Sequence, residues 1–218
     1  MTDNLKYEIQ RCGPADGPTN MAKDLDLEGG RPAVRIYTWA EPWVTLGRFQ
    51  QADAALKPGC RVPWVKRPTG GKAVLHGHDL TLGIFVPAEP GRLSVKSAYR
   101  LLISPIVEGL NRVGIRAALG ENTPFLTRAL RTADCFRHIS PNDVVDPATG
   151  RKLVGCALRI GPNGVLAQCS IPIAPPLVDP GEVFTEPHEF RPLPRNLSPA
   201  DLADALEAAF AGRSAPLA

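Results

Sequence analysis

The chain has 218 residues, a length typical of one globular domain with a substantial core. Its 44% hydrophobic and 22% charged residues fit a soluble globular protein, and a net charge of +3 is too small to indicate nucleic-acid binding. The sequence has no run of about eighteen apolar residues and no apolar signal core at its N-terminus, so we expect a cytoplasmic protein without a membrane span.

The first half of the chain predicts one short helix and several strands. Thr19 is a suitable N-cap for a helix from Asn20 to about Glu28, which the glycines and proline of residues 29–32 end. Residues 53–56 predict one helical turn. Alternating or continuous apolar residues predict strands at residues 34–39, 44–46, 62–65 and 80–86, the last two forming a hairpin around a glycine-containing loop.

The second half predicts a long helix, more strands and a final helix. Ser94 is the expected N-cap of a helix over residues 95–113, which Pro105 kinks or splits and Gly114 stops. The remaining elements are a mobile loop at 117–134, strands at 142–145, 152–154 and 165–173, a proline-rich extended segment at 174–197, and a helix at 200–211 with proline in its first turn. This order predicts an α+β fold with a mixed, mostly antiparallel sheet flanked by helices.

The loop of the predicted central hairpin is the most distinctive stretch. Residues 67–76 read Arg-Pro-Thr-Gly-Gly-Lys-Ala-Val-Leu-His, and Lys66 precedes them. The adjacent glycines Gly70 and Gly71 permit positive φ angles and a close approach of the backbone to a ligand, and loop N–H groups beside cations can cradle an anion. A solvated hairpin turn is the alternative for a Gly-Gly pair. The spacing matches neither a Walker loop nor a Rossmann fingerprint.

Four motifs, in order and spacing, resemble those of the lipoate–protein ligase and octanoyltransferase family. The loop resembles the family's Arg-Arg-x-[Ser/Thr]-Gly-Gly-Gly-Ala-Val-x-His signature, with Lys66 in place of the first Arg. Residues 20–24 resemble its opening helix, residues 42–50 its Leu-Gly-Arg-x-Gln strand and turn, and residues 150–157 its lysine motif. The resemblance covers residues 20–173, most of the chain.

The resemblance implies the fold of the biotin/lipoyl protein ligase catalytic domain. It implies a single catalytic domain over residues 1–218, with a core at 20–173 and a proline-rich segment and C-terminal helix at 174–218. Many lipoate ligases carry an additional accessory domain that supports adenylation, and we expect none here. This favours a transferase, or a ligase whose accessory part is a separate chain.

Lys152 and Cys135 are the predicted catalytic residues. By composition alone Lys152 is a solvated turn lysine, but the resemblance places it in the lysine motif, whose lysine binds the carbonyl or phosphate end of the acyl group. Free cysteine is usually a small buried hydrophobe. Cys135, however, stands with Phe136 shortly before the lysine motif, which resembles the cysteine-dependent octanoyltransferase branch of the family. The resemblance therefore implies a Cys135 nucleophile whose thiolate Lys152 favours.

Other candidate groups carry weaker signals. Cys156 lies four residues beyond Lys152, and strand alternation predicts that both share one face, so it is a rival nucleophile, although we favour packing. His76 and His78 precede Asp79, but too few ligands lie nearby to predict a metal site. We expect His138 and His188 at the surface. An odd number of cysteines without a Cys-x-x-Cys pair disfavours disulfides and zinc: Cys12, Cys60, Cys135, Cys156 and Cys169.

The remaining predicted site residues contact substrate. Asn142 and Asp143 resemble an Asn-Asp pair of the ligase branch, in which Asp143 would orient Lys152 or the acceptor lysine; a turn at a strand start is the alternative. The predicted substrate-binding residues are Arg67, Thr69, Gly70, Gly71, Lys72, Ala73, Val74, Leu75, His76, Asn142, Asp143, Gly155 and Ala157.

The sequence departs from the family pattern at two places. Lys72 replaces the third motif glycine, and residues 168–170, Gln-Cys-Ser, replace the family's His-Gly-Thr. Both departures leave the details of substrate recognition open.

Three functions are compatible with this pattern. The first is an acyltransferase that moves an octanoyl or lipoyl group from a carrier thioester, such as that of acyl carrier protein, to the lysine of a lipoyl domain or glycine-cleavage carrier protein. It would use a Cys135 acyl-enzyme, no cofactor, and a narrow apolar tunnel in which each methylene contributes about 0.8 kcal/mol.

The second function is an ATP- and Mg²⁺-dependent lipoate–protein ligase, in which Arg67 and residues 72–75 contact the nucleotide, Lys152 the acyl-adenylate, and Cys135 is dispensable. The third is a non-catalytic carrier-binding module, suggested by the lost His-Gly-Thr. We expect no nucleic-acid or membrane partner in any of them.

Overall fold

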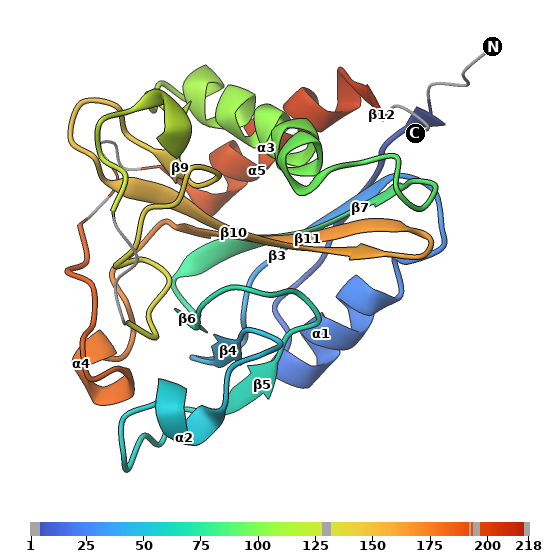
Figure 1. Cartoon of the computed structure of the whole chain (residues 1–218). Helices are drawn as coiled ribbons and strands as arrows, with labels where there is room; N and C mark the ends of the chain where they lie inside the picture. Colours follow the sequence, from blue (N-terminus) through green and yellow to red (C-terminus); the bar gives the residue numbers. More distant parts are fainter. Residues whose placement is uncertain (1–4, 128–131, 192, 194–196, 216–218) are drawn as a thin grey trace.

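The computed structural model describes residues 5–127, 132–191, 193 and 197–215, and a seven-stranded mixed sheet forms its centre (Figure 1). The strand order is β2-β3-β7-β11-β10-β9-β8; β2 and β3 pair in parallel, and every other neighbouring pair is antiparallel. The predicted α+β fold with a mostly antiparallel sheet is therefore confirmed. The strands are β2 (Glu8–Arg11), β3 (Ala33–Tyr37), β7 (Asp79–Pro87), β8 (Ala118–Leu119), β9 (Val144–Val145), β10 (Lys152–Gly161) and β11 (Gly164–Pro172).

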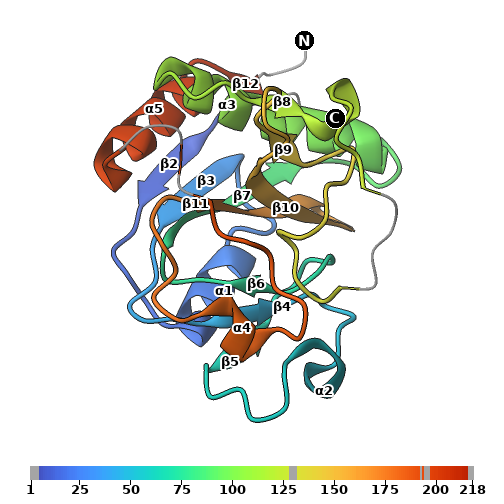
Figure 2. The ribbon, with the colours of Figure 1, turned by 90° about the vertical axis from the view of Figure 1, so that its left-hand side faces the viewer.

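Two helices, α3 (Val95–Arg112) and α5 (Pro199–Ala211), pack together over one face of this sheet, and α1 (Gly17–Leu25) lies on the other (Figures 1 and 2). The main core lies between the sheet and α3 and α5. A small pair, β1 (Leu5–Lys6) and β12 (Ser214–Ala215), joins the two ends of the described chain. Within the described residues, none of the helices has the length and apolar character that a bilayer span requires.

The long helix follows its sequence signals closely. Ser94 caps α3, its Oγ accepting from Ser97 N at 3.1 Å, and Gly114 ends the helix with a φ of 78°. The helix continues through Pro105, which is buried, so the proline does not split it. The segment expected to be a mobile loop contains β8 and a 3₁₀ turn (Gly120–Asn122), while residues 128–131 lie outside the described part.

The first helix begins earlier than predicted. It starts at Gly17 rather than Asn20 and ends at Leu25, with Asp16 as its N-cap in place of Thr19. Asp16 Oδ1 accepts from Thr19 N at 2.8 Å, and Pro18 fits the first turn because its missing N–H is not needed there. The same shift brings one side of α1 against the large sheet, where Asn20, Met21 and Asp24 are buried.

The predicted central hairpin is wrong. A second, three-stranded sheet lies beyond α1's face of the large sheet (Figure 2), in the order β5 (Trp64–Lys66), β4 (Val44–Leu46) and β6 (Val74–Leu75). β5 pairs in parallel with β4, not with β7, and Trp64 is 46% exposed. Proline cannot donate to a strand ladder, so Pro63 suits this edge position. Two short helices, α2 (Ala52–Ala55) and α4 (Pro180–Val183), accompany this sheet.

Candidate active site

Lys152 and Cys135, the two predicted catalytic residues, are in contact. Lys152 Nζ lies 3.3 Å from Cys135 Sγ and donates to the carbonyl oxygens of Cys135 and His138 at 2.8 and 2.9 Å. Its third oxygen partner, after the two carbonyls, is Asp143 Oδ2 at 2.9 Å. Burial by itself lowers the pKa of Lys152, but the Cys135 sulfur and the Asp143 carboxylate outweigh burial and raise the pKa. Lys152 is therefore a fixed cation beside the sulfur.

The glycine-rich loop carries the backbone that holds Cys135 in place. Cys135 N donates to Ala73 O at 2.9 Å, and Ala73 N donates to Ala133 O at 2.8 Å. Gly155 on β10 leaves room for the sulfur, because an added Cβ there would lie 3.2 Å from Cys135 Sγ. Three segments that are far apart in the sequence thus meet at one thiol.

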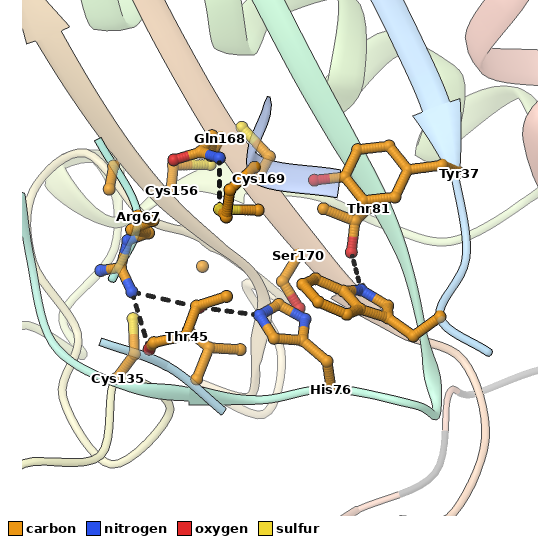
Figure 3. A pocket seen from close by; sticks show the side chains of 15 residues that line it. Tyr37, Thr45, Arg67, His76, Thr81, Cys135, Cys156, Gln168, Cys169 and Ser170 are labelled. Atoms are coloured by element: carbon orange, nitrogen blue, oxygen red, sulfur yellow. Dashed lines mark hydrogen bonds between the residues drawn. The ribbon is translucent and has the colours of Figure 1, made fainter. Parts of the chain in front are cut away.

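A small, largely apolar cavity of about 20 Å³ lies beside Cys135 and opens to solvent (Figure 3). Its wall includes Met21 of α1, Trp39 beyond β3, and Val74 and Ala157 of the two sheets. Figure 3 shows the cavity between Cys135 and Arg67 on one side and the large sheet on the other. Such a hollow suits an aliphatic chain whose reactive end faces the sulfur.

The polar side chains at the cavity are bonded to one another. His76 Nε2 pairs with Thr45 Oγ1 and its Nδ1 with Asp79 Oδ2, both at 2.8 Å, and its ring stacks on Trp39 with centroids 4.1 Å apart. Trp39 Nε1 donates to Thr81 Oγ1 at 2.9 Å. Burial acts to raise the pKa of Asp79, but His76 and the hydrogen bonds lower it to about 2. His76 therefore shapes the cavity, and its neighbours satisfy its nitrogens.

Among the described residues, no group of three or more His, Cys, Asp or Glu side chains is placed to hold a metal ion. The second histidine of the pair, His78, packs edge-on against Phe190, with ring centroids 6.0 Å apart.

Arg67 ties the glycine-rich loop together from inside. Its guanidinium donates to Thr45 O at 3.1 Å and to the carbonyl oxygens of Gly70 and Lys72, both at 2.6 Å. Burial lowers the pKa of Arg67 to about 10, so it stays charged at neutral pH. Its described hydrogen bonds thus join two carbonyls of the loop to Thr45 of β4, and it also lines the cavity.

We expect Gly47→Ala to disturb this loop. An added Cβ at Gly47 would overlap the Gly71 carbonyl oxygen, and backbone cannot move aside as a flexible side chain does. Overpacking typically costs about 1–3 kcal/mol, so we expect the free energy of unfolding of the variant to be lower by that amount. Urea titration measures this difference. The matched control is Gly70→Ala in the same loop, where an added Cβ meets nothing within 4 Å. Equal effects of the two changes would contradict the steric argument.

The remaining predicted residues have different surroundings. Ala157 and Val74 line the cavity, whereas Leu75 is buried in the core of the small sheet. Thr69 Oγ1 donates to Gln168 Oε1 at 2.7 Å. Asn142 is half-buried in the turn before β9. The other member of the predicted Asn-Asp pair, Asp143, contacts Lys152.

Cys156, the rival nucleophile, lies beyond an irregularity in β10. A register shift between Lys152 and Val154 interrupts the strand alternation; Gly155 faces Cys135, while Cys156 packs against the main core opposite Cys169 and also lines the cavity. Burial raises the pKa of Cys156 well above the ordinary value of a thiol, and its hydrogen bond to Cys169 adds to this. A buried, protonated thiol supports the packing role.

Two features of the site were missed in the sequence. His188 is not a surface residue: its side chain is only 13% exposed, and its backbone N and its Nδ1 both lie 2.7 Å from Asp134 Oδ2. His138 is half-buried, and its Nδ1 pairs with Thr127 Oγ1 at 2.9 Å. The second missed feature is a buried polar network around Asp24, and its one sequence signal was Arg35, a charged residue within an apolar strand.

The second missed feature is a buried polar network beside the cavity. Asp24 of α1 is fully buried and forms an ion pair with Arg35 of β3. Its Oδ2 accepts from Tyr37 OH at 2.9 Å and from Gln168 Nε2 at 2.7 Å. Because Gln168 also accepts from Thr69, this network links the opening helix to the glycine-rich loop.

A second, more polar hollow, here called the vestibule, adjoins the catalytic pair. Its lining includes Phe136, Lys152 and His188, with Arg151 and Arg191 nearby. The Phe136 ring centroid is 5.6 Å from Lys152 Nζ and 5.4 Å from that of His188. Lys152 therefore lies between the vestibule and the sulfur at the cavity.

Comparison with known protein families agrees with this geometry. Residues 20–210 match the family model described as the lipoyl protein ligase A/B catalytic domain, so the chain belongs to that family. Similar curated proteins include octanoyltransferases LipM. That of Kyrpidia tusciae is 34% identical over 179 residues, covering 74% of this chain and 64% of the relative. That of Exiguobacterium sibiricum is 31% identical over 192 residues, covering 80% of this chain and 66% of the relative. For the LipM of another Exiguobacterium, the chain spans 55% of the relative's length.

Solved structures show the same fold. A bi-partite lipoate protein ligase of Thermoplasma acidophilum, studied with its E2 lipoyl domain, has a TM-score of 0.71 at 19% identity and covers 95% of this chain and 83% of its own. A lipoate-protein ligase A bound with ATP has a TM-score of 0.74 at 18% identity, and the match covers 95% of this chain and 85% of the ligase chain. The large sheet with its flanking helices is thus the catalytic fold of lipoate ligases.

Proposed function

We propose that this chain is an acyltransferase that moves an octanoyl or lipoyl group from a carrier thioester to the lysine of a lipoyl domain or glycine-cleavage carrier protein. The observation that carries the proposal is the contact of 3.3 Å between Lys152 Nζ and Cys135 Sγ beside an apolar cavity. The curated octanoyltransferases at 31–34% identity support the same reaction.

In the first half-reaction, the Cys135 thiolate attacks the carbonyl carbon of the donor thioester. The bond from carbon to Cys135 sulfur forms, the bond to the donor sulfur breaks, and the donor leaves as a thiolate that takes a proton from solvent. The aliphatic chain would enter at the apolar cavity, where each methylene removed from water contributes about 0.8 kcal/mol. Lys152 supplies a fixed positive charge where negative charge develops.

In the second half-reaction, the acceptor lysine amine attacks the acyl-enzyme. The carbon–nitrogen bond forms, the carbon–sulfur bond breaks with its electron pair returning to Cys135, and the amine loses a proton. Neither half-reaction consumes ATP, because the thioester already activates the acyl group.

Intact mass spectrometry of an apo lipoyl domain tests the proposal. After incubation with this protein and octanoyl acyl carrier protein, without ATP, we expect a mass gain of one octanoyl group. A gain that requires ATP and free lipoate would instead indicate a ligase, and binding without any acylation would indicate a non-catalytic module.

A further inference from the structure

The second half-reaction needs a base, and Lys152 is poorly suited to be one. The amine of the acceptor lysine has an ordinary pKa near 10.4 and must lose its proton to attack. An ammonium group has three N–H bonds. Those of Lys152 have three oxygen partners, the carbonyls of Cys135 and His138 and the carboxylate of Asp143, with the sulfur as a fourth neighbour. Taking up another proton would require it first to lose one inside this cage.

His188 is placed differently. Its Nδ1 lies 2.7 Å from Asp134 Oδ2, and Asp134 is 1% exposed. A carboxylate at one ring nitrogen holds the proton there, which leaves Nε2 as a hydrogen-bond and proton acceptor. Asp134 directly precedes Cys135, and its Oδ1 accepts from Phe136 N at 2.9 Å, so one carboxylate positions both the nucleophile's loop and the imidazole.

The location of His188 fits a group that meets the acceptor. It lines the vestibule together with Lys152, whereas Cys135 lines the separate acyl cavity. Among its described lining residues the vestibule also has one carboxylate, Glu189, which is 80% exposed and pairs with Arg191 at 3.3 Å. A carboxylate is a much weaker base than an imidazole at neutral pH.

We infer that His188 accepts the proton of the acceptor lysine amine in the second half-reaction, with Asp134 as its positioning residue. The inference rests on the proposed function. As the carbon–nitrogen bond forms and the carbon–sulfur bond breaks, the amine proton passes to His188 Nε2 and then to solvent. Cys135 is regenerated as the thiolate beside Lys152.

The two half-reactions separate this role from a structural one. Octanoyl-Cys135 enzyme is formed first with octanoyl acyl carrier protein, and apo lipoyl domain is then added while both masses are followed. For His188→Gln we expect transfer to the lipoyl domain to fall about 100-fold, the usual scale of general base catalysis, with acylation of Cys135 affected far less. Glu182→Gln, an exposed side chain of α4 that lines neither hollow, should transfer within about twofold of the unchanged protein.

Chemical rescue tests the inference even if a variant is less stable. Added imidazole should restore part of the transfer by His188→Gly. Transfer by His188→Gln at the unchanged rate, or an equal loss in both half-reactions that imidazole does not relieve, would overturn the inference. If the unchanged protein forms no octanoyl-Cys135 at all, the proposed function fails instead.

Discussion

Replacing Cys135 by serine should abolish acyl transfer and leave the fold intact. A serine hydroxyl is not ionised near neutral pH, so the Lys152 charge has no thiolate to favour, and loss of a nucleophile typically lowers turnover by at least about 10³-fold. The oxygen partners of Lys152, including Asp143, remain, so the buried cation stays paired. Intact mass of the lipoyl domain measures transfer, and thermal unfolding measures the fold.

The matched control is Cys156→Ser. Cys156 packs against the main core opposite Cys169 and also lines the cavity, but the change leaves the Lys152–Cys135 pair in place, so it should reduce transfer far less than Cys135→Ser and lower the unfolding free energy by about 1–2 kcal/mol. Transfer that survives in Cys135→Ser would rule out the acyl-enzyme. If Cys156→Ser alone lost transfer, the nucleophile would have been assigned to the wrong cysteine.

Sequence patterns predicted elements whose signals are local. The helix α3 carries its own cap, Ser94, its own stop, Gly114, and a periodic apolar face, so its bounds were found almost to the residue. The pairing of β5 was not predicted correctly, because contacts between residues distant in sequence decide which strand pairs with which. The same apolar run could face β7 or, as the structure has it, β4.

The candidate site divides in the same way. The motifs predicted Cys135 and Lys152, and the structure brings them into contact. An irregularity in β10 beside Lys152 interrupts the alternation from which the face of Cys156 was predicted, and the sequence carries no local mark of it. His188 was missed because its partner, Asp134, lies 54 residues away.

Replacing Asp24 by asparagine should strongly destabilise the protein. It would leave the Arg35 guanidinium buried without its carboxylate, and breaking a buried pair by removing one partner typically costs about 3–5 kcal/mol. Urea titration of the unfolding transition would measure the loss. The matched control is Asp204→Asn, which removes a carboxylate whose pair with Arg11 is exposed; it should change the midpoint little. Similar midpoints for the two variants would contradict the argument.

The effect of Asp24→Asn should reach the active site as well. Asp24 accepts from Gln168, which in turn accepts from Thr69 of the glycine-rich loop, the loop whose Ala73 holds Cys135 by its backbone. Loosening one end of this chain should lower transfer even under conditions where the variant remains folded. Combining Asp24→Asn with Arg35→Met removes the unpaired charge and should recover part of the stability. If transfer stayed lost in this double variant, the hydrogen-bonded link to Gln168, and not the ion pair, would be what Asp24 contributes to the site.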